Sequence, residues 1–230
     1  MPENIDPGKR AAGYAAVDRF VRNGTCIGLG TGTTAYFAIE RVGQRVARGE
    51  RIAAVPTSLE TQRLCARWNV PVLGLLERPI DVAIDGADEV AADWSLTKGG
   101  GGALFREKAV ALSADRFVVI VTPNKIVEKL GAFPTPVEIV PYAAPYVLRE
   151  IGARWNGLNV DRRGGEAPYV TDNGNWILDC RFGRIDDPTA IDTALRAIHG
   201  VVSTGIFVAM AGEIIVGHDD GSATALPRSS

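Results

Sequence analysis

Short apolar runs alternate with longer segments of helical spacing over the first 121 residues. The apolar stripe through Ala12, Ala16, Phe20 and Val21 predicts a helix over residues 9–21, because positions three or four apart share one helix face. Further helices are predicted at 34–48, 59–68 and after Gly102, and strands at 25–30, 52–55, 70–73, 80–84 and 117–121. Such alternation is typical of a mostly parallel sheet covered by helices on both faces.

The pattern changes after Pro134. Here we expect an α+β arrangement, with a hairpin that turns on the Asn-Gly pair at 173–174. The expected segments are strands at 137–140, 205–210 and 213–216, helices at 145–151 and 188–198, and the hairpin at 170–180. The fold class is therefore α/β. We predict a Rossmann-like domain from residues 1–132 and 207–230, whose last strands return to the first sheet, and a smaller α+β, ferredoxin-like domain from residues 133–206.

The composition is that of a globular protein, with 46% hydrophobic and 23% charged residues among 230. The net charge of −2 and the lack of clustered Lys and Arg argue against a nucleic-acid partner. We see no signal peptide and no apolar run long enough to span a bilayer, so we expect no membrane association. The three scattered cysteines are expected to be buried thiols in a reducing cytoplasm.

The first of three unusual stretches covers residues 28–34 (GLGTGTT) and follows a predicted strand. Ligands of open α/β sheets bind beyond the carboxyl ends of strands, and glycines, hydroxyls and helix N-terminal amides suit a phosphate. The stretch has neither the lysine of a P-loop nor the full spacing of a dinucleotide fingerprint. A tight turn with a threonine N-cap is an equally good interpretation of these residues alone.

The second stretch, residues 83–89 (AIDGADE), places Asp85, Asp88 and Glu89 directly after a strand. One interpretation is an Asx-turn with a helix cap. The other is that crowded carboxylates bind and polarise sugar hydroxyls. A carboxylate-only Mg²⁺ site is a third possibility, although both histidines lie far away in sequence.

The third stretch, residues 98–108 (KGGGGALFREK), has four glycines between Lys98 and an apolar helix. The run is short and lacks the serines of a flexible linker, which favours a structured loop. The helix is apolar nearly all round, so we expect it to be buried. Glu107 on this helix would either pair with a neighbouring Arg106 or Lys108, or act as a general base.

In this order and spacing, the three stretches resemble ribose-5-phosphate isomerase of type A. Residues 170–179 (VTDNGNWILD) and 200–207 (GVVSTGIF) also match, so the resemblance covers nearly the whole chain. It implies interconversion of ribose 5-phosphate and ribulose 5-phosphate in the non-oxidative pentose phosphate pathway. It also implies no essential metal or organic cofactor, a Rossmann-like domain with a small lid domain, and a dimer or tetramer.

The resemblance assigns Glu107 as the catalytic base, Lys98 as the active-site lysine, and Asp85 and Asp88 as the paired aspartates. It implies that these aspartates and Lys98 also contact the substrate, together with the phosphate-side loop and the backbone beside them. The residues of these loops are Thr31, Gly32, Thr33, Thr34, Gly86, Ala87, Gly99, Gly100 and Gly101.

Two further lysines, Lys9 and Lys125, fall where the family places substrate-binding lysines. The segment before Lys125 reads TPN at 122–124, whereas the family often has an Asp-x-Ser pattern, so this contact rests on a shorter match. Thr33 replaces a common serine and keeps the hydroxyl.

These residue types fit an aldose–ketose isomerisation, which moves a proton between C2 and C1 through an ene-diol(ate). Glu107 would collect and return the proton, while Lys98 and the glycine-loop amides would stabilise the developing oxyanion. Asp85 or Asp88 would assist opening of the furanose ring. A non-catalytic phosphosugar sensor and a CoA transferase are the alternatives, but residues 1–24 are too short for the helix-turn-helix that such sensors carry.

Overall fold

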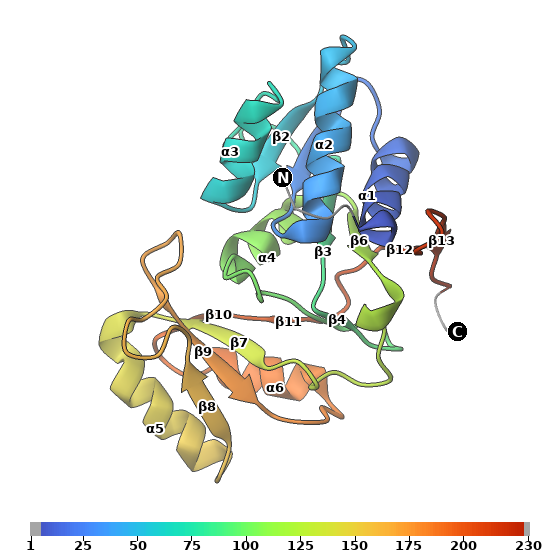
Figure 1. Ribbon diagram of the computed structural model, residues 1–230. Helices are drawn as coiled ribbons and strands as arrows, with labels where there is room; N and C mark the ends of the chain where they lie inside the picture. Colours follow the sequence, from blue (N-terminus) through green and yellow to red (C-terminus); the bar gives the residue numbers. More distant parts are fainter. Residues whose placement is uncertain (1–5, 228–230) are drawn as a thin grey trace. The chain divides into compact units, whose positions relative to one another are not determined.

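Residues 6–227, which the computed structural model describes, form two compact units (Figure 1). The second unit comprises Asp88–Phe105 and Val127–Ala209, and the first unit comprises the rest. The sequence had assigned residues 88–105 to the Rossmann-like domain. In the structure this segment supplies two short strands that pair with each other, and one of them also pairs with a further strand of the second unit.

A six-stranded sheet forms the centre of the first unit, in the order β13-β12-β6-β3-β1-β2. All neighbouring strands are parallel except the β12–β13 pair. The strands are β1 (Cys26–Leu29), β2 (Ala53–Pro56), β3 (Val82–Gly86), β6 (Phe117–Val121), β12 (Glu213–Gly217) and β13 (Ala223–Ala225). Because β2 and β3 lie on opposite sides of β1, the strand order reverses there, and such a switch point opens a crevice at the carboxyl ends of the strands.

Helices cover both faces of this sheet, as predicted. They are α1 (Pro7–Phe20), α2 (Thr33–Ala47), α3 (Leu59–Arg67) and α4 (Leu104–Ser113). Ile27 and Leu29 of β1 lie in a core cluster with residues of α1 and α2. Side chains alternate along a strand, so Gly28 faces the other side, where an added Cβ would lie 2.4 Å from Val110 Cγ1 of α4.

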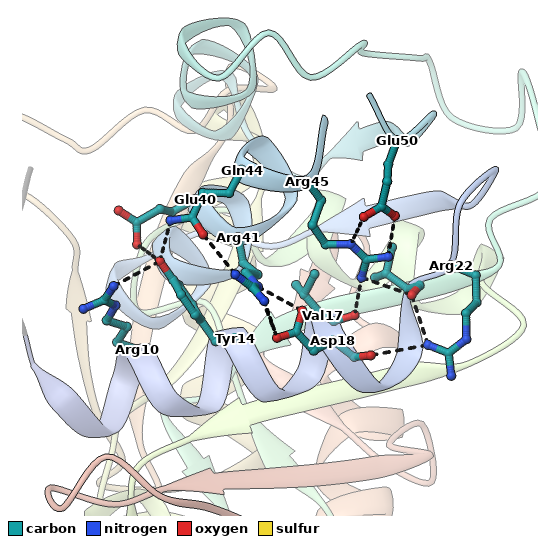
Figure 2. Close-up of polar contacts among 11 residues, drawn as sticks. Arg10, Tyr14, Val17, Asp18, Arg22, Glu40, Arg41, Gln44, Arg45 and Glu50 are labelled. Atoms are coloured by element: carbon teal, nitrogen blue, oxygen red, sulfur yellow. Dashed lines mark hydrogen bonds and ion pairs between the residues drawn. The ribbon is translucent and has the colours of Figure 1, made fainter. Parts of the chain in front are cut away.

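A polar network joins α1 to α2 along their exposed edges (Figure 2). The Tyr14 hydroxyl donates to Glu40 and accepts from Gln44, at 2.8 and 2.7 Å. Arg41 of α2 forms an ion pair with Asp18 of α1, with a shortest separation of 2.8 Å. These contacts fix the register of α1 against α2 and use no residue of the predicted site.

The second unit contains a four-stranded antiparallel sheet in the order β10-β7-β9-β8. Its elements are β7 (Thr135–Ile139), α5 (Ala144–Arg154), β8 (Asn159–Arg162), β9 (Trp176–Arg181), α6 (Pro188–Arg196) and β10 (Val201–Thr204). The βαββαβ succession with strand order 4-1-3-2 is the predicted ferredoxin-like arrangement. Val137, Leu178 and Cys180 pack with both helices in one buried cluster.

A three-stranded sheet completes the second unit, in the order β11-β5-β4. Its strands are β4 (Glu89–Val90), β5 (Leu96–Thr97) and β11 (Ile206–Phe207). The strand predicted at 205–210 is therefore shorter and belongs to this sheet, whereas β12 returns to the six-stranded sheet as expected. Two single-turn helices, η1 (Pro123–Lys125) and η2 (Pro141–Ala143), follow β6 and β7.

The strand predicted at residues 70–73 is wrong. Ala54 donates its N–H to the Pro71 carbonyl and accepts from the Leu73 N–H, and only an isolated bridge with Val72 results. The segment lies beside the edge strand β2 for too few residues to form a ladder.

The hairpin predicted at residues 170–180 is also wrong. The turn itself is present, with Gly174 at φ +80° and its N–H donating to the Thr171 carbonyl. However, β9 pairs with β8 and β7 rather than with a strand before the turn. Asn-Gly specifies the local turn, whereas the strand partner is set by the packing of the whole sheet.

Helix α4 is less buried than predicted. Leu104 and Val110 are buried, but Phe105 is 39% and Leu112 is 70% exposed. The apolar count of this helix did not distinguish the face that packs on the sheet from the face that does not.

Within residues 6–227, no helix combines the length and the apolar character that crossing a membrane requires. Cys26, Cys65 and Cys180 are free, buried thiols, as expected.

Candidate active site

The turn after β1 is held by a cluster of hydroxyl groups. Thr31 Oγ1 lies 2.8 Å from both Thr57 Oγ1 and Ser58 Oγ, and 3.2 Å from Thr61 Oγ1. The Thr61 hydroxyl donates to the Gly30 carbonyl at 2.8 Å. The side chain of Thr31, predicted to contact phosphate, is therefore bonded to its protein neighbours. The Thr-Ser pair at 57–58 was not predicted as part of the site, although it directly follows β2, the strand beside β1.

The N-terminus of α2 presents backbone amides without a side-chain cap. Its N-cap is Gly32, at φ +107°, and among the described residues no side chain caps the helix. The threonine N-cap allowed by the sequence is therefore not formed. Thr33 is exposed and Thr34 half-buried in the first turn. Open amides and the positive end of the helix dipole favour an anion here.

Asp85, at the end of β3, is brought against the turn after β1. Its Oδ1 accepts the Thr31 N–H at 3.2 Å and the Gly86 N–H at 2.7 Å. An added Cβ on Gly30 would lie 1.9 Å from this oxygen, so only glycine allows the carboxylate this close. The predicted loop and the first predicted aspartate thus meet at the β1–β3 switch point, and Asp85 is 3% exposed.

Glu107 lies in the first turn of α4 and is 4% exposed. Its helix approaches β1 closely because Gly28 leaves room for Val110. Gly28 and Gly30 therefore serve contacts within the protein, not the approach of a ligand to the backbone. Glu107 is therefore a buried carboxylate in the same unit as Asp85 and the α2 N-terminus.

Lys9 and Lys125, whose predicted roles rest on shorter sequence matches, lie near the carboxyl ends of β12 and β6. Lys9 is half-buried in the first turn of α1 and forms an ion pair with Asp6 at 3.4 Å. This turn lies against β12, because an added Cβ on Gly8 would be 2.9 Å from the Gly217 carbonyl. Lys125, also half-buried, ends η1 directly after β6.

In the second unit, Lys98 follows β5 and begins the glycine loop. Its backbone N–H donates to the Gly205 carbonyl at 2.8 Å, and its side chain is 2% exposed. The ammonium lies 5.6 Å from the centre of the Phe207 ring, within range of a cation–π contact. Gly99 and Gly102 have φ of +98° and +83°, and the Gly102 N–H closes the turn onto the Gly99 carbonyl at 3.0 Å. The loop is structured, as predicted.

Asp88 contacts this loop directly. Its Oδ2 accepts the Gly100 N–H at 2.8 Å, and an added Cβ on Gly100 would lie 2.6 Å from Oδ1. Gly86, Ala87 and Asp88 are half-buried, and Gly100 is exposed. The structure thus brings the second predicted aspartate together with the predicted glycine loop.

Glu89, the third acid of the stretch, has a structural role. It is 3% exposed and accepts the Thr97 hydroxyl and the N–H groups of Gly131 and Phe133, at 2.8–3.0 Å. Across residues 6–227, no group of three or more His, Cys, Asp or Glu side chains is placed to hold a metal ion.

Three residues that the sequence did not indicate support the glycine loop. Arg163 Nη1 donates to the Gly99 carbonyl at 2.9 Å and to the Gly100 carbonyl at 3.2 Å. Its other nitrogens bind Asp179 at 2.5 and 2.9 Å. The Tyr169 hydroxyl lies 3.4 Å from the Gly101 carbonyl. Asp179 ends a stretch that matched the family, but nothing in its sequence context pointed to this loop.

Comparisons with known proteins identify the family of this chain. The profile of the family "Ribose 5-phosphate isomerase A (phosphoriboisomerase A)" matches residues 53–221. Ribose-5-phosphate isomerase A of Methanothermobacter thermautotrophicus is 45% identical over 215 residues, which cover 93% of this chain and 95% of the relative.

Solved structures of similar proteins give the same result. Ribose 5-phosphate isomerase from Plasmodium falciparum superposes with a TM-score of 0.92 at 31% identity, over 98% of this chain and all of that one. A D-ribose-5-phosphate isomerase in complex with phospho-erythronic acid superposes with a TM-score of 0.91 at 36% identity, over the same shares. On its sequence and its fold, this chain belongs to the ribose 5-phosphate isomerase A family.

Proposed function

We propose that Glu107 is the base with which this chain interconverts D-ribose 5-phosphate and D-ribulose 5-phosphate. The interconversion follows from membership of the family and places the protein among the aldose–ketose isomerases of the pentose phosphate pathway. The assignment of the base rests on one observation: Glu107 is a buried carboxylate, 4% exposed, in the first turn of a helix that packs on β1.

The proton transfer needs one base and one oxyanion site. Glu107 removes the proton from C2 of the open-chain aldehyde, and the C–H electrons form the C1–C2 double bond as charge develops on O1. The same carboxyl group returns the proton to C1, while the O2 proton passes to O1, so that O2 becomes the ketone oxygen and O1 the hydroxyl of the product. Lys98 and the glycine-loop amides are the groups that would stabilise the oxyanion, each contributing on the order of a few kcal/mol.

Asp85 and Asp88 would assist opening of the furanose ring before this step. Each is held in place by a backbone N–H, from Thr31 and Gly100 respectively. A fixed carboxylate is a suitable acceptor for a sugar hydroxyl proton.

The phosphate of the substrate would bind at the N-terminus of α2. Its uncapped first turn, with Thr33 and Thr34, offers amides and hydroxyls, and Lys9 and Lys125 would add positive charge. A related isomerase has been solved in complex with phospho-erythronic acid, a phosphorylated sugar acid, which supports binding of a phosphorylated sugar by this family. Binding the unreactive phosphate would position C1 and C2 for reaction.

We further propose that the protein acts in the cytoplasm, needs no metal or organic cofactor, and assembles as a homodimer or tetramer. These properties are those that the family resemblance implies. Size-exclusion chromatography with light scattering would measure the assembly state directly.

The deciding experiment is the turnover of ribose 5-phosphate by Glu107→Gln in the presence of EDTA. We expect kcat to fall at least about a hundredfold, the lower range for general acid–base catalysis, with binding of phospho-erythronic acid retained. Glu60→Gln, which changes an exposed first-turn glutamate of α3, is the matched control and should leave kcat unchanged. Normal turnover by Glu107→Gln would remove this residue from its role. Loss of wild-type activity in EDTA, restored by a divalent metal, would instead support a carboxylate–metal site.

A further inference from the structure

A continuous chain of hydrogen bonds leads from the sheet of the second unit to Asp88. Asp179, on β9, holds the Arg163 guanidinium by two bonds of 2.5 and 2.9 Å. Arg163 donates to the Gly99 carbonyl at 2.9 Å, and the Gly100 N–H donates to Asp88 at 2.8 Å. All of these residues belong to the second unit.

The middle link of this chain is a single peptide group. The Gly99 carbonyl and the Gly100 N–H belong to the same trans peptide bond, so they point in opposite directions within one plane. Arg163 binds the carbonyl edge of this peptide and Asp88 binds the N–H edge. A second donation from Arg163, to the Gly100 carbonyl at 3.2 Å, fixes the next peptide plane as well.

The glycine loop needs such support more than other loops do. Glycine has more backbone freedom than any other residue, and Gly100 and Gly101 are exposed. Without Arg163, the 99–100 peptide could rotate and withdraw its N–H from Asp88. A guanidinium is suited to this role because its rigid fork can hold a carboxylate on one edge and carbonyls on another.

A neighbouring ion pair shows that an Arg–Asp pair alone does not create this link. Arg181 pairs with Asp161 at 3.1 Å, across the same two strands, and Asp161 lies directly opposite Asp179. Both members of this second pair are more than half exposed, whereas Arg163 and Asp179 are each 18% exposed. Among the contacts of the described residues, only the less exposed pair, Arg163–Asp179, reaches the glycine loop.

We infer that Arg163, held by Asp179, is a positioning residue for the isomerase reaction: it fixes the 99–100 peptide and thereby the carboxylate of Asp88. This inference rests on the proposed role of Asp88 in catalysis. Arg163 touches no reacting atom in this scheme and acts only through the loop.

The test is a double-mutant cycle on kcat/KM for ribose 5-phosphate, built from Arg163→Ala and Asp88→Ala. Alone, Arg163→Ala should lower kcat/KM by about tenfold to a hundredfold, the loss that a displacement of about 1 Å can cause. In the Asp88→Ala background the same change should cost less than about twofold, because the group it positions is gone. Arg181→Ala, the matched control, should cost less than about twofold in either background.

Three results would overturn the inference: no loss from Arg163→Ala, an equal loss in both backgrounds, or an equal loss from Arg181→Ala. An active Asp88→Ala enzyme would instead refute the proposed role of Asp88, so the two failures are distinguishable. Thermal unfolding of each variant shows whether it is folded at the assay temperature. If Arg163→Ala is not, Arg163→Lys enters the same cycle, since a single ammonium lacks the fork that holds Asp179 and both carbonyls. It should give a smaller loss that again disappears in Asp88→Ala.

Discussion

The two glycine-rich loops of the molecule use glycine for different reasons. At the end of β1 and directly after it, Gly28 and Gly30 make room for Val110 and for the Asp85 carboxylate. After β5, the glycines supply positive φ at Gly99 and Gly102, and the exposed part of the loop is held by hydrogen bonds. The first loop is tightly packed against neighbouring side chains. The exposed part of the second loop is instead held by hydrogen bonds from Arg163.

The supports of the two loops also come from different distances along the chain. Thr31 is bonded to hydroxyls only 26–30 residues away, at the end of the adjacent parallel strand. Gly99 and Gly100 are bonded to Arg163, 63–64 residues away. A parallel sheet gathers the carboxyl ends of its strands, so the first loop finds support there. The second loop follows a two-residue strand and depends on a distant side chain.

The largest effect should come from Gly30→Ala. The new methyl group would lie 1.9 Å from Asp85 Oδ1, so the carboxylate must leave its position at the switch point. We expect kcat/KM to fall by about a hundredfold or more, as for displaced catalytic geometry. Gly28→Ala is the control: it would press on Val110 instead, and should cost about 1–3 kcal/mol in unfolding free energy with a smaller loss of activity. Equal activity losses at equal stability would contradict the packing argument.

Gly100→Ala should have a smaller effect on the second loop. Its methyl group would lie 2.6 Å from Asp88 Oδ1, but Gly100 is exposed and Asp88 only half-buried, so the two groups can move apart. We expect a loss of about tenfold in kcat/KM and little change in thermal unfolding temperature, because an exposed site tolerates substitution. A loss as large as that of Gly30→Ala, or a marked destabilisation, would show that the second loop is packed as tightly as the first.

Much of the fold could be predicted because its signals are local. The apolar run at 117–121 is β6 to the residue, and α1, α2 and α3 lie within a few residues of their predicted bounds. The strand partner of β9 could not be predicted, because an Asn-Gly turn does not determine which strands pair. β4 and β5 are two residues long and have no periodicity to detect.

Site residues could be predicted where they belong to a recognisable sequence motif. The sequence predicted that both aspartates and both loops belong to one site; the structure adds that Asp85 contacts the turn after β1 and Asp88 the glycine loop. It could not indicate that the Thr31 hydroxyl is turned toward Thr57, nor that Arg163 supports the loop. Such contacts depend on how strands pair in three dimensions, and a single arginine outside any recognised motif gives no signal.

Thr31→Val and Thr33→Val should distinguish a hydroxyl that stabilises the first loop from one that binds the substrate. Removing the Thr31 hydroxyl takes a shared partner from Thr57, Ser58 and Thr61, so we expect about 1–3 kcal/mol lower unfolding free energy in urea. Thr33 is exposed, so its substitution should change stability by less than about 0.5 kcal/mol and raise KM instead. The reverse assignment of effects would place the Thr31 hydroxyl on the substrate.

The smallest effects concern the buried thiols, which report separately on the two units. Burial raises the pKa of Cys65, in the first unit, and of Cys180, in the second, to about 12. The folded state therefore keeps these protons while the unfolded chain ionises near its ordinary thiol pKa of about 8.5. The contribution of these buried, protonated thiols to the unfolding free energy is therefore fully present below pH 8.5 and is lost as pH rises toward 12.

Cys65→Ala and Cys180→Ala should each remove part of this alkaline loss, measured as the slope of unfolding free energy against pH above 8.5. At pH 8, the thiols should react with a disulfide reagent only when the surrounding unit opens, because the thiolate is the reactive form. Cys26→Ala/Cys180→Ala and Cys26→Ala/Cys65→Ala keep only Cys65 and only Cys180, so comparing them gives the opening rate of each unit. If the second unit depends on its buried Arg163–Asp179 pair, Arg163→Ala should speed the labelling of Cys180, which neighbours Asp179 on β9, and leave that of Cys65 unchanged. Faster labelling of both thiols would mean that the two units open together.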